Sequence, residues 1–295
     1  MPLPLMQVDA FTNHPLGGNP CAVVFDADHL TPATMQAIAQ EMNLSETAFV
    51  MKSSRADFRV RYFTPAEEIP MAGHPTIATT FALVTAGRLR LTEAVTTITL
   101  EMPAGLIPVA IHQTDGEIEQ IVMTQNKPAF LQIHRAEEVM PAFGLSPDDV
   151  LPGASIQTVS TGTPQLMIPL INHDALRRAV LDIPVYGRLR EKSDFFSPHL
   201  FCLQGATEAG QTFARHFGTP PDTMEDPFTG SATGGMASYL WHHGLLDATS
   251  FVAEQGHWMN RPGTATVTCV GTPAQLEGVN VGGQAALVFS GQLML

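Results

Sequence analysis

Two uncharged segments of the chain each begin with a glycine followed by a polar residue. Gly73-His74 opens the first segment, and Gly230-Ser231 opens the second. A buried helix that begins with small residues directs its unpaired N–H groups and the positive end of its dipole at one place. Two such helix starts that face one cleft would bind a carboxylate or a similar anion. The spacing fits equally well with glycines that only permit close packing and with His74 and Ser231 as caps.

Two acidic residues are candidates for proton transfer and substrate orientation. Glu46 stands at the mouth of an apolar strand, beside Ala48 and Phe49. Desolvation there would raise the pKa of its carboxyl group, so that it exchanges a proton near neutrality. A solvated glutamate in a loop is the plainer interpretation of this residue. Asp226 precedes Pro227 by one residue and is placed to orient or polarise a substrate amine or hydroxyl.

No other motif in the sequence supports a phosphate, metal, nucleotide or serine-hydrolase site. Gly17-Gly18-Asn19 resembles a phosphate cradle, but it has no accompanying lysine and is better interpreted as a turn. The sequence contains no HExxH, CxxC, GxSxG or GxGxxG motif, and the adjacent His242 and His243 would diverge on a helix. We therefore expect no metal site and no organic cofactor. The three cysteines, Cys21, Cys202 and Cys269, are expected in the core.

The segments around the two helix starts form an internal repeat. Residues 61–63 read Arg-Tyr-Phe and residues 215–217 read Arg-His-Phe, and each triplet precedes a Thr-Pro and an acidic segment. The Pro-to-Gly spacing before each helix start is the same in both copies. An ordered set of matches predicts a duplication into two related halves, each wrapped around one buried helix.

The elements around these residues are short strands and buried helices. Apolar and alternating patterns predict strands at residues 7–11, 21–25, 47–51, 58–63, 103–110, 118–123, 155–160, 165–170, 264–269, 277–281 and 285–289. Helices are expected after the Thr31 cap and over residues 147–150 and 173–180. The uncharged stretches 69–87 and 227–246 are interrupted by Gly, Pro and His, which favours buried helices over membrane spans.

Composition excludes several classes of protein. The chain has 295 residues, which suggests about two domains. It carries 15 basic and 28 acidic residues, for a net charge of −13. Such an acidic chain is a poor partner for nucleic acid or for an anionic membrane. Three cysteines without a paired pattern and a start without a secretory signal indicate a cytoplasmic protein.

Six motifs in their order along the chain identify a family. The chain resembles the PhzF-like phenazine biosynthesis family, particularly its YddE-like branch, within the diaminopimelate epimerase fold superfamily. The resemblance extends over essentially the whole chain. Its motifs are Val8-Asp9-Ala10-Phe11-Thr12, Gly18-Asn19-Pro20, Ser45-Glu46-Thr47-Ala48-Phe49, Arg61-Tyr62-Phe63-Thr64-Pro65, Gly73-His74-Pro75-Thr76 and Asp226-Pro227-Phe228-Thr229-Gly230-Ser231-Ala232.

The resemblance implies an α+β fold with two pseudo-symmetric halves. Each half would be a curved, mostly antiparallel sheet or partial barrel around a central buried helix. We expect residues 1–118, completed by residues 284–295, to form the N-terminal half and residues 119–283 to form the C-terminal half. The active site would lie in the cleft between the halves.

The resemblance also implies roles for individual residues. The best-understood member of the family moves a proton on a dihydro-hydroxyanthranilic acid without a metal or organic cofactor, and the resemblance implies Glu46 as the matching proton shuttle here. His74 and Asp226 are the other implied catalytic residues. The implied substrate-binding residues are Asn19, Gly73, Gly230 and Ser231. The two opposed cysteines of a diaminopimelate epimerase are missing, because Ala72 precedes Gly73 and residues 229–232 contain no thiol.

The sequence therefore predicts a cytoplasmic, cofactor-free isomerase that acts on a small carboxylate, cyclic or unsaturated. A homodimer is compatible with this prediction, since it is the commonest assembly of soluble proteins. Two alternatives stay open. One is a non-catalytic protein that binds a small molecule or a partner on the same fold. The other is a lyase or an epimerase of an activated C–H group.

Overall fold

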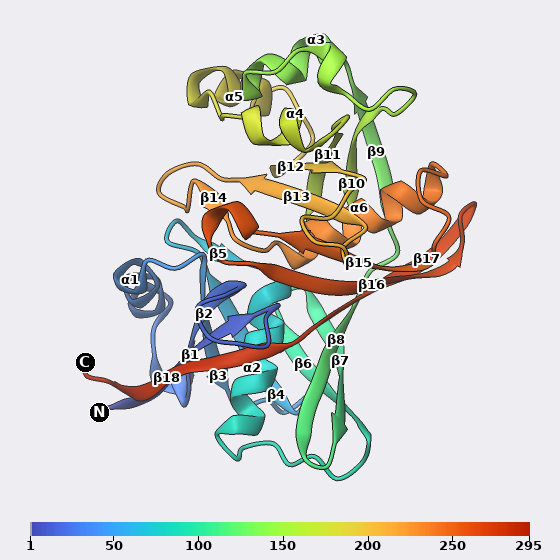
Figure 1. Ribbon diagram of the computed structural model, residues 1–295. Coiled ribbons are helices and arrows are strands. Elements are labelled where there is room, and N and C mark those ends of the chain that lie inside the picture. The colour runs from blue at the N-terminus through green and yellow to red at the C-terminus, as the bar shows by residue number, and fades with distance from the viewer. Residues whose placement is uncertain (1) are drawn as a thin grey trace.

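Strands and two central helices dominate the computed structural model, which describes residues 2–295 (Figure 1). The strands of these residues are linked in one continuous 18-stranded, curved sheet system. The first part of the chain contains β1 (Leu3–Ala10), β2 (Asn19–Val24), α1 (Pro32–Met42), β3 (Glu46–Met51), β4 (Phe58–Phe63), β5 (Glu68–Ile69), α2 (Gly73–Thr85), β6 (Val95–Met102), β7 (Gly105–Thr114) and β8 (Glu117–Gln125).

The second part of the chain repeats this plan with extra short helices. It contains β9 (Ala129–His134), α3 (Ala136–Val139), β10 (Ile156–Ser160), β11 (Pro164–Pro169), α4 (His173–Arg178), α5 (Ile183–Arg190), β12 (Ser197–Cys202), β13 (Thr212–Phe217), β14 (Glu225–Asp226), α6 (Gly230–His242), β15 (Ser250–Gln255), β16 (Gly263–Thr272), β17 (Gln275–Gly283) and β18 (Ala285–Leu293). Short 3-10 turns lie at Ala27–His29, Met140–Phe143, Pro147–Asp149 and His257–Met259.

Strand pairing confirms the internal duplication. From β1 to β4 the successive pairs are antiparallel, parallel and antiparallel, and the pairs from β10 to β13 follow the same order. β4 then pairs in parallel with β6 across α2, just as β13 pairs in parallel with β15 across α6. Both helices have 13 residues. Each half is thus a curved sheet around one helix, as expected.

The two central helices are buried on nearly all sides. Ten of the 13 residues of α2 and 11 of the 13 residues of α6 are buried, and neither helix contains Asp, Glu, Lys or Arg. A helix that is apolar or small on every face belongs inside a core. Among residues 2–295, no helix has the length and apolar character needed to cross a membrane.

A forked ion pair is duplicated together with the strands. Arg61 Nε and Nη2 donate to the two carboxylate oxygens of Glu68 at 2.7 and 2.5 Å, which ties β4 to β5. Arg215 donates in the same way to Glu225, at 2.8 Å for both contacts, and ties β13 to β14. Each pair therefore fixes the chain just before a central helix begins.

Strand pairing joins the halves in two places. The last strand, β18, follows the strands of the second half along the chain but pairs with β1 in the first half. Likewise β9 follows directly after the strands of the first half but pairs with β10 in the second half. Between these two places, β8 pairs with both β7 and β17 (Figure 1). Because β8 belongs to both sheets, strand pairing sets no boundary at residue 118, and the division into residues 1–118 with 284–295 and residues 119–283 stays a prediction.

Local signals placed most elements within a few residues of the observed ones. Helix α1 begins at Pro32 after Thr31, whose hydroxyl accepts the Thr34 N–H at 3.2 Å. The helix expected over residues 147–150 is a single 3-10 turn, because Ser146 and Asp149 close a capping box around only three residues. The patterns did not predict strands β5, β6, β9, β12, β13, β14 and β15.

Candidate active site

The starts of α2 and α6 touch in the middle of the molecule. A Cβ atom added to Gly73 would lie 3.0 Å from Gly230 Cα and from the Ser231 nitrogen. The first N–H groups of both helices have no partner within their own helix, and they meet at this one place. A cavity of about 340 Å³ opens there, and residues of both halves line it. The two helix starts thus provide an electropositive end wall for an anion.

Glu46 stands on one side of this cavity, as the first residue of β3. Its side chain is 18% exposed, yet its Oε2 atom is buried and has no hydrogen-bond partner within residues 2–295. Burial raises the pKa of this carboxyl group well above its ordinary value, and the nearby Asp226 and Asp222 raise it further. A buried carboxyl group without donors holds its proton more firmly than a solvated one.

His74, the second residue of α2, faces Glu46. Its Nε2 atom is 3.1 Å from Glu46 Oε2, although the angles at the two atoms are not those of a hydrogen bond. Burial lowers the pKa of His74 to about 3, so the ring is neutral near pH 7. The neutral ring adds no charge beside the Glu46 carboxyl group, and its Nε2 atom lies next to the buried Oε2 atom.

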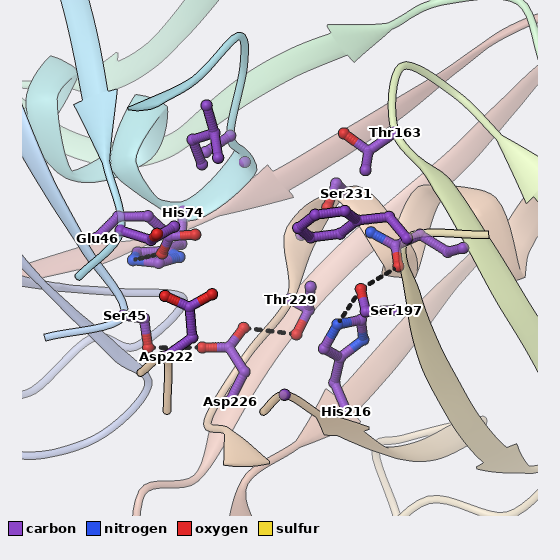
Figure 2. A pocket seen from close by; sticks show the side chains of 18 of the residues that line it. Ser45, Glu46, His74, Thr163, Ser197, His216, Asp222, Asp226, Thr229 and Ser231 are labelled. Atoms are coloured by element: carbon purple, nitrogen blue, oxygen red, sulfur yellow. Dashed lines mark hydrogen bonds and ion pairs between the residues drawn. The ribbon is translucent and has the colours of Figure 1, made fainter. Parts of the chain in front are cut away.

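Asp226, the last residue of β14, has a much richer set of partners. Oδ1 accepts from Asn19 Nδ2 at 2.7 Å and from Ser45 Oγ at 2.8 Å, and Oδ2 accepts from Thr229 Oγ1 at 2.6 Å (Figure 2). Burial raises the pKa of Asp226, whereas these three donors oppose the increase. Donors directed at both oxygens stabilise the ionised form.

The two carboxyl groups of the site are therefore unlike. Glu46 lacks donors and lies close to another acid, whereas Asp226 has three donors. We assign the negative charge to Asp226 and the proton to Glu46, since neighbouring carboxyl groups in unequal surroundings take different protonation states.

The predicted site residues converge at this place. Glu46, Gly73, His74, Asp226, Gly230 and Ser231 all line the cavity. Asn19 lies behind the wall, fully buried, where its Nδ2 donates to Asp226 and, at 2.8 Å, to the Phe228 carbonyl. Its contacts are with the residues that hold the site and not with the cavity.

Three polar residues of the opposite wall were missed by the sequence analysis. Ser197 Oγ donates to Gln165 Oε1 at 2.6 Å, and His216 Nε2 lies 2.9 Å from the same hydroxyl. All three side chains line the cavity (Figure 2). The internal repeat is a signal for His216 alone, which occupies the place of Tyr62 in the Arg-Tyr-Phe triplet, whereas no sequence motif marks Ser197 or Gln165.

The cysteines are buried, as expected, and none is among the residues that line the cavity. In the described part of the chain, no group of three or more His, Cys, Asp or Glu side chains is placed to bind a metal ion.

Two related halves around one cavity define the epimerase-like fold class, and the acidic and imidazole groups on the cavity walls are suited to acid–base chemistry. The description "Phenazine biosynthesis-like protein" belongs to the family model that matches residues 8–291. The chain therefore belongs to the PhzC-PhzF family of phenazine biosynthesis-like proteins.

Individual relatives support this assignment. The chain is 35% identical to the protein named "Uncharacterized isomerase YddE" of Salmonella typhimurium, over 97% of this chain and 96% of that protein. It is 34% identical to the trans-2,3-dihydro-3-hydroxyanthranilate isomerase of Pseudomonas fluorescens, over 98% of both. A crystal structure of the PhzF-family phenazine biosynthesis protein of Bacillus anthracis superposes with a TM-score of 0.89 at 32% identity, with both chains fully covered. The expected family, fold class and enzyme class are confirmed.

Proposed function

We propose that this isomerase moves a proton between two carbon atoms of a small cyclic or unsaturated carboxylate, with Glu46 as the general acid and base. The observation that carries the proposal is the unpartnered, buried Oε2 atom of Glu46, which stands beside neutral His74 on the wall of a cavity that ends in two helix starts. The hydroxyanthranilate relative supports the ring carboxylate as substrate class, because it is named for such a compound.

The helix starts would hold the substrate. The backbone N–H groups at Gly73 and Gly230, with the Ser231 hydroxyl, would bind the carboxylate. This contact offsets the repulsion expected from a chain whose net charge is −13. Asp226, ionised and fixed by its three donors, would orient an amine or hydroxyl substituent and would favour the protonated form of Glu46.

The chemical step requires only one proton and no change in oxidation state. The protonated Glu46 gives its proton to the carbon at one end of the conjugated system, the electron pair shifts along that system, and the resulting Glu46 carboxylate takes a proton from the activated C–H at the other end. One double bond changes place and the atoms balance. A carboxyl group is too weak a base for an ordinary α-proton of an amino acid, but it suits a vinylogous C–H. His74 would face the Glu46 carboxyl group as a neutral ring, so that no positive charge beside Glu46 holds it in the ionised form.

Deuterium uptake tests this function. The protein would be incubated in D₂O with cyclic and unsaturated amino and hydroxy acids, and label and isomer formation would be followed by mass spectrometry and NMR. We expect Glu46→Gln to lose both signals, because an amide cannot take or give the proton.

The matched control is Glu67→Gln, since Glu67 is a second carboxyl residue that lines the same cavity. This variant should keep the activity. If Glu46→Gln transferred protons as fast as the unchanged protein, Glu46 would not be the shuttle. Tight binding of the acids without any exchange would instead favour a binding protein.

A further inference from the structure

The duplication places one particular residue opposite Glu46. Arg61 of β4 pairs with Phe49 of β3, and the equivalent Arg215 of β13 pairs with Leu200 of β12. Glu46 lies three residues before Phe49, and Ser197 lies three residues before Leu200. Each is the first residue of its strand. Ser197 is therefore the counterpart of Glu46 in the second half. Figure 2 shows the two on opposite sides of the cavity, with Asp226 and Thr229 between them.

The hydroxyl of Ser197 is committed to a short chain of hydrogen bonds. It has one proton, which it donates to Gln165 Oε1. His216 Nε2 must then be the donor in its 2.9 Å contact with Ser197 Oγ. A neutral imidazole carries one N–H, so the Nδ1 atom of His216 has no proton. It lies 3.3 Å from His199 Nδ1, and His199 is therefore the donor in this contact. The second lone pair of the Ser197 hydroxyl has no partner and can accept a hydrogen bond from a ligand.

Gln165 supplies the complementary group. Its Oε1 is occupied by Ser197, whereas no residue from 2 to 295 accepts a hydrogen bond from its Nε2 in this structure. Gln165 and Ser197 are only 3% and 7% exposed, and both line the cavity. An acceptor and a donor side by side match a hydroxyl group, which both donates and accepts.

This wall carries no charge. Burial lowers the pKa of His216 to about 3, and burial together with the neighbouring His216 ring lowers the pKa of His199 well below its ordinary value, so both imidazoles are neutral. A second carboxylate or an ammonium group would meet no opposite charge here, and its desolvation would be uncompensated. A keto oxygen would use only the amide donor and leave the serine lone pair unpaired.

We propose that Ser197 and Gln165, held in place by His216, form a recognition subsite for an uncharged hydroxyl substituent on the side of the cavity away from Glu46. The proposal rests on the proposed function, because it takes the carboxylate end of the substrate to lie at the two helix starts. It narrows the substrate class to hydroxylated ring carboxylates. His216 is a positioning residue here, since it acts through the serine.

Binding of simple aromatic acids tests the subsite without requiring turnover. The probes are benzoate and the three monohydroxybenzoates, which fit a cavity of this size, since about 150 Å³ holds a benzene ring. Affinities would be measured by titration calorimetry. We expect at least one hydroxybenzoate to bind the unchanged protein about five- to tenfold more tightly than benzoate, which is the effect of one or two net hydrogen bonds.

Ser197→Ala and the isosteric Ser197→Cys should both abolish this preference and leave the affinity for benzoate nearly unchanged. Ser231→Ala is the matched control at the other end of the cavity, and it should weaken all four ligands by the same factor. Two variants of Ser197 are used so that the test can still be made if one of them does not fold.

The outcomes separate the two proposals. A hydroxybenzoate preference that survives both substitutions, or that is missing from the unchanged protein, overturns the subsite. If the preference depends on Ser197 while Glu46→Gln keeps full proton transfer, the subsite stands and the proposed function falls. If benzoate itself does not bind, the carboxylate site is refuted and the subsite falls with it.

Discussion

The two walls of the cavity come from equivalent strands but have opposite characters. On the first wall, Glu46 has a buried oxygen without a partner and a neutral histidine 3.1 Å away. On the second wall, Ser197 has its proton donated to Gln165 and its hydroxyl held by His216. The backbone duplication thus provides two equivalent places, and the partners of each side chain decide which place is reactive. An unpartnered acid is available for chemistry, whereas a partnered hydroxyl is fixed for recognition.

The largest expected effect lies in this contrast. Glu46→Gln should lower the rate of proton transfer by about 10²- to 10⁴-fold, the usual contribution of a general acid or base. Ser197→Ala should raise KM and change kcat by less than about tenfold, because it removes a binding contact. Steady-state kinetics on the substrate found by deuterium uptake would check both. Equal losses of kcat would show that the two walls share the chemistry.

The contact between the helix starts gives the next largest effect. In Gly73→Ala the new methyl group would lie 3.0 Å from backbone atoms of Gly230 and Ser231. Backbone atoms cannot move away by a change of rotamer, as a side chain can. We expect a loss of about 1–3 kcal/mol in unfolding free energy and weaker binding of every carboxylate.

A matched glycine tests that interpretation. Gly187, within α5, has no atom within 4 Å of an added Cβ. Gly187→Ala should therefore stabilise the protein by about 0.5–1 kcal/mol. Urea unfolding of both variants measures the difference, and a Gly73→Ala protein as stable as the parent would mean that the helix starts can separate freely.

The repeated ion pairs allow a finer comparison of the two halves. Arg61 and Arg215 have side chains of nearly equal exposure, 16% and 15%. Arg215 alone also donates to the carbonyls of Leu176 and Ala179, at 3.0 and 2.8 Å. Arg215→Met should therefore lower the free energy of unfolding by about 1–3 kcal/mol more than Arg61→Met does. Denaturant melts of the two variants would check this, and equal losses would mean that the carbonyl contacts add nothing.

The smallest effects concern the dependence of stability on pH. Folding raises the pKa of Glu46, so above its ordinary value of 4.5 the folded state keeps a proton that the unfolded state has lost. Stability falls as pH rises through that window, and Glu46→Gln should remove this decrease. Folding lowers the pKa of His216 to about 3, so its contribution to stability is lost as pH falls from about 6.5 to 3.

His216→Gln should make this loss of stability at low pH smaller without removing it, because folding also lowers the pKa of His74 and His199, and it should leave the decrease caused by Glu46 unchanged. Thermal melts between pH 4 and pH 9 measure both slopes. A Glu46→Gln protein with the alkaline slope of its parent would mean that Glu46 is ionised in the folded state.

Much of this architecture could be predicted from the sequence, because it depends on local rules. The cap at Thr31, the uncharged runs of α2 and α6 and the repeated Arg-aromatic-Phe triplets all act over a few residues. The residues alone left Glu46, His74 and Asp226 as open candidates, and the family resemblance made them predicted site residues.

The rest depends on side-chain direction and strand register. Asn19 belongs to a recognisable motif, but its side chain faces the interior behind Asp226, which no motif reveals. Ser197 and Gln165 belong to no motif at all, and their roles follow only from pairing across three strands. The strand β6 carries an alternating, threonine-rich pattern that itself predicts a strand, so it was overlooked although the signal was present.

The exchange of β18 into the first half has a consequence for how the chain can be rearranged. Leu3 of β1 and Leu293 of β18 pair side by side (Figure 1). A short linker between these two strands would therefore close the polypeptide into a ring without disturbing the sheet. Reopening that ring in the connection between β8 and β9, at residues 126–128, yields a circular permutant in which the two halves follow each other in the reverse order around the same cavity.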